Sequence, residues 1–342
     1  MSELVVESCG PANSIQDGGR RGLQRIGLPR SGALDPVALA AANALVGNPH
    51  SAPAIELLLG GITLRALGGA ARLALAGCDF PIKCGGEPIA THRSFLLSHG
   101  QQVVIGSARN GVCGILAVEG GYDVAEVLGS ASLHARSQVG GLDGRNLRPG
   151  DRLPLKLDAK PGVERTMAPL ATKSSPAIRV VLGPQSDHFP DAAVSLLVES
   201  AFTVTSECDR MAYRLAGPAI RPLRNTNFIS DGVAEGSIQV SGSGQLIVTL
   251  ADRQTIGGYP KIATVITADL PLLANCLPGE AVRFAAVSIE QAQAELRRHC
   301  RRLAAMATEM LARANDSNFS SDAAIECTAG NVVSALDMGT WG

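Results

Sequence analysis

The sequence has few aromatic residues and almost no net charge. Aromatic residues make up 3% of its 342 positions, and 30 basic side chains are balanced by 31 acidic ones. Nucleic-acid-binding surfaces usually combine a basic excess with aromatic platforms for base stacking, and anionic membrane surfaces also attract basic proteins. The composition therefore argues against a nucleic-acid partner and against binding to an anionic membrane surface.

The sequence also lacks a recognisable membrane-spanning or targeting segment. A transmembrane helix needs about 20 apolar residues, whereas the richest apolar stretch, Val37 to Gly47, is shorter and contains Asn43. Glu3 and Glu7 are acidic where a signal peptide carries basic residues. We therefore expect a cytoplasmic protein.

Motifs for metals, nucleotides and attached biotin are missing. The eight cysteines form no Cys-x-x-Cys pair, and the six histidines lack the His-Glu-x-x-His spacing, so no metal site is expected. The sequence contains no P-loop of the form Gly-x-x-x-x-Gly-Lys-Ser/Thr, and no Met-Lys-Met sequence that would carry biotin. We therefore expect that this chain binds no cofactor firmly.

The pattern of the sequence favours a mainly β fold with few helices. Most periodic segments are short and are bounded by glycine or proline, as β-strands are. Many short strands with glycine turns favour barrels or sandwiches over a doubly wound parallel sheet. Asp35 can cap a helix over Val37–Val46 that ends at Gly47. Ser288 and Gln291 form a capping box at the start of an amphipathic helix.

The chain divides around a segment without hydrophobic periodicity. Residues 158–176 are rich in Lys, Pro, Ser and Thr and are typical of a linker. The halves on either side share weak sequence echoes, such as the Pro-Gly-acid turns that follow Arg148 and Leu277. The predicted organisation is an N-terminal half over 1–157, a linker over 158–176, a C-terminal half over 177–287, an amphipathic helix over 288–313 and a tail of uncertain order over 314–342.

The strongest concentration of polar residues surrounds a predicted buried strand over 245–250. The strand leads to Asp252 and Arg253, and a glycine turn then leads to Lys261. Arg253 and Lys261 could stabilise a carboxylate, a phosphate or a developing oxyanion, and Asp252 could orient Arg253 or act as a base. A structural Asp–Arg pair beside a tight turn explains the same residues equally well. The candidate site comprises the catalytic candidates Asp252, Arg253 and Lys261 and the substrate-binding candidates Arg210, Gln239, Thr255, Gly257, Gly258 and Tyr259.

Two further polar segments accompany this site. Arg210 and Arg214 are four residues apart and either bind one anion or form inter-strand ion pairs. The polar residues between Ser14 and Gln24 lie in turns that lead to the capped helix. We expect a solvent-facing Lys261 to converge on one cleft with Asp252, Arg253, Arg210 and Gln239.

These motifs resemble a known family, namely allophanate hydrolase subunit 2, also called the KipA or biotin-dependent carboxyltransferase-like family. Its members include the C subunit of ATP-dependent 5-oxoprolinase and a part of urea carboxylase. Relative to the family pattern, Ala131 stands where an arginine is usual. The matching stretches, in chain order, are Gln16-Asp17-Gly-Gly-Arg20, Gly27-Leu-Pro-Arg-Ser31-Gly32-Ala-Leu-Asp35-Pro, Ala42-Asn43-Ala-Leu-Val-Gly47-Asn48, Glu119-Gly-Gly-Tyr-Asp123, Gly183-Pro-Gln185, Asp209-Arg210-Met and Asp252-Arg-Gln-Thr255-Ile-Gly-Gly-Tyr-Pro-Lys261.

The resemblance implies a fold, partners and an activity. The fold would be a cyclophilin-like β-barrel in each half, and the partner a KipI-type protein (allophanate hydrolase subunit 1). With a LamB-type subunit as well, the complex would open 5-oxoproline to glutamate and consume ATP. Two alternatives stay open. The chain would otherwise be the carboxyltransferase component of a urea or amide carboxylase, with biotin on another chain, or a regulatory protein that binds a KipI-type kinase inhibitor.

Overall fold

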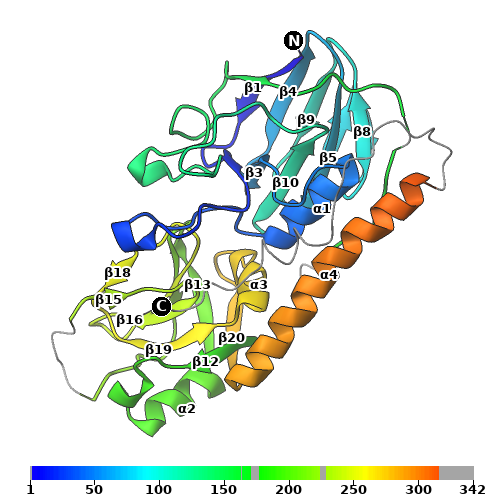
Figure 1. The fold of residues 1–342 in the computed structure, drawn as a ribbon. Coiled ribbons are helices and arrows are strands. Elements are labelled where there is room, and N and C mark those ends of the chain that lie inside the picture. The colour runs from blue at the N-terminus through cyan, green and yellow to red at the C-terminus, as the bar shows by residue number, and fades with distance from the viewer. Residues whose placement is uncertain (1, 163, 171–176, 224–228, 316–342) are drawn as a thin grey trace.

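The computed structural model describes residues 2–162, 164–170, 177–223 and 229–315. The fold is mainly β with few helices, which confirms the predicted fold class, and one sheet of the C-terminal half closes into a seven-stranded barrel. In Figure 1 the two halves lie one above the other, and a long C-terminal helix runs beside both. Within the described residues, no helix combines the length and apolar character needed to cross a bilayer.

The N-terminal half consists of two sheets that enclose one apolar core. Leu4 and Leu64 from one sheet and Leu75 from the other are among the fully buried residues of this core. The first sheet has the order β11-β1-β4-β9-β6-β7, with β1 Glu3–Cys9, β4 Ile62–Leu67, β6 Ile82–Cys84, β7 Glu87–Ile89, β9 Gln102–Ile105 and β11 Arg152–Pro154. The second has the order β2-β3-β10-β5-β8, with β2 Ser14–Gln16, β3 Ala54–Leu58, β5 Ala71–Gly77, β8 Ser94–Leu97 and β10 Cys113–Val118.

Helix α1, Pro36–Val46, covers the outer face of the second sheet. Strands β5 and β10 are buried along their whole length, because one face meets the first sheet and the other meets α1. The Asp35 carboxylate accepts hydrogen bonds from the backbone N–H groups of Val37 and Ala38, and Gly47 ends the helix with a φ of 79°. The predicted helix and both of its caps are therefore confirmed.

The C-terminal half is built on the closed barrel, in the order β12-β19-β16-β17-β14-β13-β20. Helix α2, Asp191–Glu199, packs on β20, and a separate two-stranded sheet joins β15, Asp231–Gly232, to β18, Ile256–Gly257. The short helix α3 spans Leu270–Ala274. The barrel strands are β12 Ile178–Leu182, β13 Ala201–Cys208, β14 Ala212–Ala216, β16 Ser237–Val240, β17 Leu246–Thr249, β19 Lys261–Val265 and β20 Ala281–Ala286.

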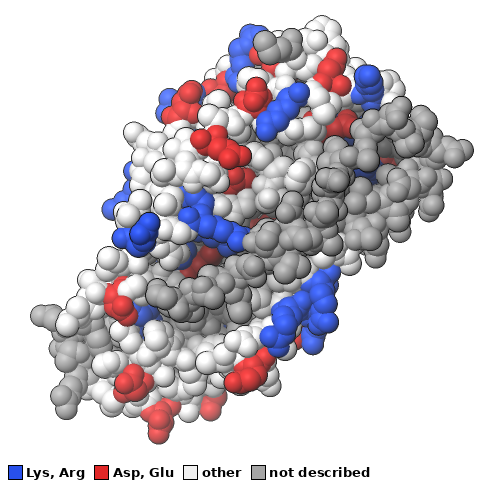
Figure 2. All heavy atoms as spheres, viewed as in Figure 1, with Lys and Arg blue, Asp and Glu red and all other residues white. Residues whose placement is uncertain are grey.

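Helix α4, Ile289–Asn315, contacts both halves. It packs on α1 of the N-terminal half and on β12 of the barrel, and Arg179 joins the barrel to Glu295 of this helix at 3.0 Å. The predicted capping box is present, since Ser288 and Gln291 exchange hydrogen bonds. Basic side chains gather along α4 in Figure 2, and the exposed arginines of the helix include Arg297, Arg298, Arg301 and Arg302.

The described part of the predicted linker packs on the N-terminal half. Ala159 donates a backbone hydrogen bond to Ala70, and the carbonyl of Arg165 accepts one from Ser94. Most of the predicted tail, residues 316–342, lies outside the described residues. One apolar cluster includes α1, the outer face of β5 and β10, and the barrel interior, so the two halves share a core.

Candidate functional site

Three buried side chains, Lys261, Gln239 and Arg253, lie on or near strands β16 and β19 of the barrel, and with the exposed carboxylate of Asp231 we call them the barrel cluster. Strands β16 and β19 are antiparallel neighbours, and their register places Gln239 opposite Lys261. Lys261 is only 2% exposed, and its Nζ atom lies 3.2 Å from Oδ2 of Asp231, a residue of β15. The backbone N–H of Gly232 and the Lys261 charge lower the pKa of Asp231. Lys261 is therefore a buried cation, which corrects the prediction that it faces solvent.

Two further donors of the barrel cluster are buried without an acceptor. Nε2 of Gln239 and Nη1 of Arg253 have no hydrogen-bond partner among the described residues. Nε of Arg253 donates to the carbonyl of Val233 at 3.0 Å, and the nearest carboxylate to Nη1, that of Glu235, is 4.0 Å away. Burial lowers the pKa of Arg253. Buried donors without acceptors are costly, so this arrangement suits a ligand that presents oxygen atoms to them.

The glycine turn covers the barrel cluster with backbone rather than side chains. A Cβ atom on Gly257 would lie 2.8 Å from Nε2 of Gln239, closer than carbon and nitrogen atoms can approach. The backbone carbonyl of Thr255 accepts a hydrogen bond from the N–H of Val233. Gly258 is half-buried, and the Tyr259 side chain is 48% exposed. A side chain at residue 257 would therefore require the end of the Gln239 side chain to shift.

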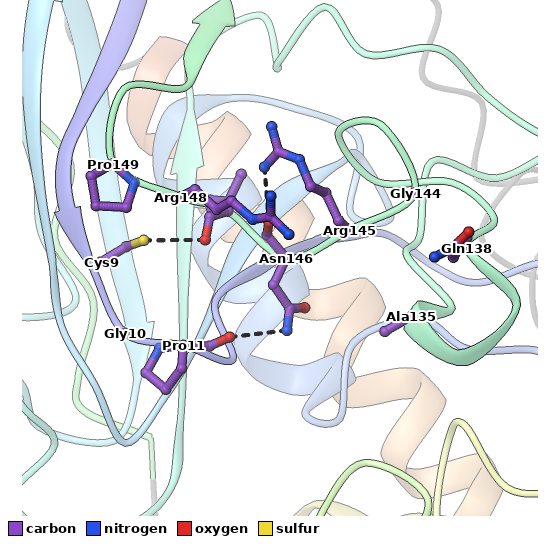
Figure 3. Close-up of a pocket in the computed structure, with 11 residues that line it drawn as sticks. Cys9, Gly10, Pro11, Ala135, Gln138, Gly144, Arg145, Asn146, Arg148 and Pro149 are labelled. Atoms are coloured by element: carbon purple, nitrogen blue, oxygen red, sulfur yellow. Dashed lines mark hydrogen bonds between the residues drawn. The ribbon is translucent and has the colours of Figure 1, made fainter.

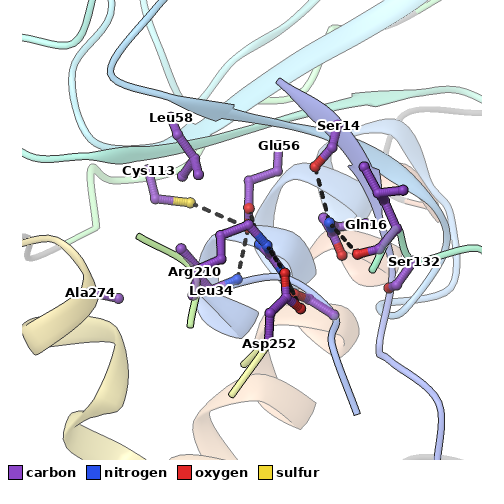
Figure 4. Close-up of polar contacts among 12 residues, drawn as sticks. Ser14, Gln16, Leu34, Glu56, Leu58, Cys113, Ser132, Arg210, Asp252 and Ala274 are labelled. Atoms are coloured by element: carbon purple, nitrogen blue, oxygen red, sulfur yellow. Dashed lines mark hydrogen bonds and ion pairs between the residues drawn. The ribbon is translucent and has the colours of Figure 1, made fainter. Parts of the chain in front are cut away.

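Arg210 and Asp252 belong to a different cluster, in the seam between the two halves (Figure 4). Nε and Nη2 of Arg210 donate to the two carboxylate oxygens of Asp252, at 2.8 and 3.3 Å. Nη1 forms an ion pair with Glu56 of the N-terminal half, and Nη2 donates to the carbonyl of Gly32 at 2.6 Å. Arg210 thus ties the barrel to the other half of the molecule.

The charges in this seam depend on one another. Burial raises the pKa of Glu56, although the Arg210 charge opposes that shift. Burial lowers the pKa of Arg210, but the charges of Glu56 and Asp252 outweigh burial and the net shift is upward. Removing one member of such a buried set leaves its partners uncompensated.

The residues that the sequence predicted to converge have different partners in the structure. Asp252 and Arg253 are consecutive, yet Asp252 pairs with Arg210 in the seam whereas Nε of Arg253 donates to the carbonyl of Val233. The sequence also allowed a structural Asp–Arg pair instead of a catalytic one. Asp252 does form such a pair, but its partner is Arg210 rather than Arg253. Arg210 pairs with Asp252 and Lys261 with Asp231, so the convergence of all five residues on one cleft stays a prediction.

Sequence reasoning missed Glu56 and Asp231. Glu56 is fully buried in β3, Ala54–Leu58, whose other residues are apolar. A carboxylate inside such a strand signals a buried partner, but that partner, Arg210, is 154 residues away. Asp231 lies in a polar segment and carries no local signal of its contact with Lys261.

A surface pocket of about 460 Å³ lies elsewhere on the N-terminal half (Figure 3). It is lined by residues 9–11, 135, 138 and 144–149 and contains none of the predicted site residues. Arg145 in its wall is held by both oxygens of Asp151, at 2.7 and 2.8 Å. Across the residues that the structure describes, no three His, Cys, Asp or Glu side chains gather closely enough to hold a metal ion.

The fold and the sequence together place the chain in a family. Residues 26–286 match the model of the carboxyltransferase domain, subdomains A and B, and the chain belongs to this family. Over 285 residues it is 37% identical to the C subunit of 5-oxoprolinase from Haemophilus influenzae, an alignment that covers 83% of this chain and 91% of that protein.

Solved structures agree with this assignment. The crystal structure of TTHA0988 matches with a TM-score of 0.76 and 35% identity, covering 83% of this chain and 55% of that one. The Kluyveromyces lactis urea carboxylase matches with a TM-score of 0.81 and 26% identity, covering 89% of this chain and 29% of that one. The chain thus spans little more than half of the first protein and less than a third of the second.

Proposed function

We propose that this chain is the C-type subunit of an ATP-dependent 5-oxoprolinase, which opens 5-oxoproline to glutamate. The observation that carries the proposal is the alignment with the C subunit of the H. influenzae 5-oxoprolinase along 91% of that protein. Such a protein works in a complex, with a KipI-type protein and a LamB-type protein as the proposed partners. This chain lacks a P-loop motif, so we assign the use of ATP to the assembled complex.

The barrel cluster supports this proposal chemically. Hydrolysis of a lactam places negative charge on the carbonyl oxygen, and 5-oxoproline also carries a carboxylate. Lys261, Gln239 and Arg253 present N–H donors from buried positions, where charge stabilisation is stronger than in water. We assign Lys261 and Gln239 to the oxygen that gains charge and Arg253 to an anionic part of the substrate. Asp252, expected to be catalytic, has the role of holding Arg210.

The runner-up is a carboxyltransferase that acts on a urea-like amide, with biotin carried by another chain. The name of the matching family and the match to K. lactis urea carboxylase favour it. The same donors would stabilise the anionic oxygen of an amide that accepts a carboxyl group. A regulatory protein that binds a KipI-type kinase inhibitor would need no such buried donors.

Reconstitution with both proposed partner proteins tests the proposal. We expect ATP hydrolysis that depends on 5-oxoproline and a loss of about 10²–10³ in rate for Lys261→Met. Lys83→Met is the matched control, since Lys83 is exposed on β6 of the other half. Carboxylation of urea by a complex that contains a biotin protein, without 5-oxoproline-dependent ATP hydrolysis, would establish the runner-up instead.

A further inference from the structure

The outer face of helix α4 carries four arginines within two helical turns. Arg297, Arg298, Arg301 and Arg302 are all exposed, and Figure 2 shows basic side chains gathered along this helix. Residues three or four positions apart lie on one side of a helix, and the stretch from Arg297 to Arg302 rises about 8 Å along the helix axis. The four guanidinium groups therefore form one compact basic surface, which we call the arginine face.

Among the described residues, a single carboxylate pairs with the arginine face. Oε1 of Glu295 lies 2.6 Å from Nη1 of Arg298, and Oε2 of the same residue lies 3.0 Å from Nη1 of Arg179 in the barrel. One carboxylate is therefore shared between two arginines. Within the same part of the chain, the other three arginines of the face have no ion pair.

The sequence of α4 explains why these charges have no partner on their own helix. Helical ion pairs join residues three or four positions apart, and no acidic residue stands at either distance from Arg297, Arg301 or Arg302. Arginine instead follows arginine at four positions twice, in the pairs 297–301 and 298–302. Like charges at this spacing destabilise a helix. The arrangement therefore lowers helix stability unless an opposite charge comes from outside α4.

The other side of α4 is covered by the protein itself. The helix packs on α1 and on β12, and Leu303, on the side opposite the arginines, is only 9% exposed. A helix that binds a membrane surface inserts its apolar side among the lipids. Here that side faces the two halves of the molecule, so the arginine face does not suit a lipid surface.

The composition of α4 favours an acidic peptide over a nucleic acid. Helix α4 contains no Phe, Tyr or Trp, and single-stranded nucleic acids are bound largely by stacking their bases on aromatic side chains. Duplex binding relies on many contacts along the phosphate backbone, whereas the arginine face is short. Arginine pairs with carboxylates through two parallel hydrogen bonds, so a few neighbouring acidic side chains of one peptide match this face.

We propose that the arginine face is a docking surface for an acidic peptide segment of another protein, whose carboxylates pair with Arg297, Arg301 and Arg302. The inference goes beyond the reaction assigned to the barrel cluster and holds for either candidate function, because it stands on the charges of α4 alone. Since α4 packs on both halves, a partner bound here contacts the helix that both halves share.

Binding of a fluorescent octaglutamate peptide to the full-length chain tests the proposal, with fluorescence anisotropy as the readout. We expect binding at low ionic strength that weakens about tenfold as salt is raised to about 0.3 M, because salt screens exposed charges. Octathymidylate, which has a similar charge, and vesicles of phosphatidylcholine with phosphatidylglycerol should bind more weakly. Tighter binding of either, or no binding of the peptide at low salt, would overturn the proposal.

Variants place the bound peptide on α4. Arg297→Gln/Arg301→Gln should weaken octaglutamate binding about tenfold, as expected for the loss of two exposed ion pairs. Its melting temperature should not fall, because the change removes a repulsive pair from the helix. The matched control, Lys83→Gln/Lys156→Gln, removes the same charge from exposed positions of the N-terminal half and should bind as the native chain does. Equal weakening in both double variants would mean non-specific attraction and refute the site.

The chain's own acidic residues after α4 give a last test. Residues 316–342 contain four acidic residues and no lysine or arginine. Asp322→Asn/Glu326→Gln should leave octaglutamate binding to the full-length chain unchanged. Tighter binding in this variant would mean that these acids compete for the arginine face, and would refute the proposal that the face serves another protein.

Discussion

At the scale of single residues, the buried state of Lys261 changes what its substitution should do. Lys261→Met keeps the length of the side chain and removes a buried charge, so we expect a melting temperature close to that of the native protein. Lys261→Ala also removes the packed stem and should cost about 2–4 kcal/mol, in the range of other large-to-small core substitutions. Thermal melts of both variants check this. Equal melting temperatures for the two would show that the stem does not pack.

Arg210 offers a second test at this scale. Arg210→Met leaves Glu56 and Asp252 buried without their cation, and breaking a buried pair costs about 3–5 kcal/mol. Adding Glu56→Gln should recover part of the loss. Urea unfolding at neutral pH of the single and double variants measures both effects, and a double variant less stable than the single one would contradict the assigned pairing.

The same pair predicts a pH dependence. Burial raises the pKa of Glu56, so between its ordinary and raised values the folded state holds a proton that the unfolded state releases. The free energy of unfolding should therefore fall as pH rises through that window. The Arg210 charge opposes this upward shift, so in Arg210→Met the pKa of Glu56 should rise further and the pH window should widen. The stability lost in Arg210→Met should therefore be smaller at pH 5, where Glu56 can take up a proton, than at pH 7.5. Urea unfolding at the two pH values measures this, and an equal loss at both would show that Glu56 stays charged throughout.

At the scale of elements, the short sheet of β15 and β18 positions Gln239. Gly257→Ala would push a methyl group against Nε2 of Gln239, so we expect lower turnover of the reconstituted complex with little change in melting temperature. Gly232→Ala, on the paired strand, meets no atom within 4 Å and is the matched control. Equal turnover of the two variants would remove Gln239 from the barrel cluster.

The helices also show how far sequence reasoning reaches. The caps of α1 and α4 were predictable because Asp35 and Ser288 bond to backbone groups within three residues. The barrel cluster was predictable in part, because Arg253 and Lys261 flank one turn. The pairing of Arg210 with Glu56 was not, because it spans 154 residues and depends on how the halves pack. The resemblance to a family predicted which motifs occur and in what order along the chain. It predicted no contact between residues of different motifs.

At the scale of the whole molecule, two exposed apolar side chains lie in or near the β15–β18 sheet. Ile229 is 88% exposed and Ile256 is 60% exposed, both beside the β15–β18 sheet, and exposed apolar groups that gather together mark interfaces. We expect Ile229→Asp/Ile256→Asp to reduce co-purification with the proposed KipI-type partner while the melting temperature stays unchanged. Leu128→Asp is the control, on a loop of the N-terminal half. Undiminished capture of the double variant would place the partner elsewhere.

The core that α1 shares with the barrel interior has a consequence for how the protein denatures. Two independent domains melt separately, whereas elements that bury one another's apolar surface lose that burial together. Calorimetry of the full chain should therefore give a single cooperative endotherm. A substitution that breaks the ion pairs of Arg210 in the seam should lower the temperature of that single transition. No intermediate with a native barrel and a denatured N-terminal half should accumulate.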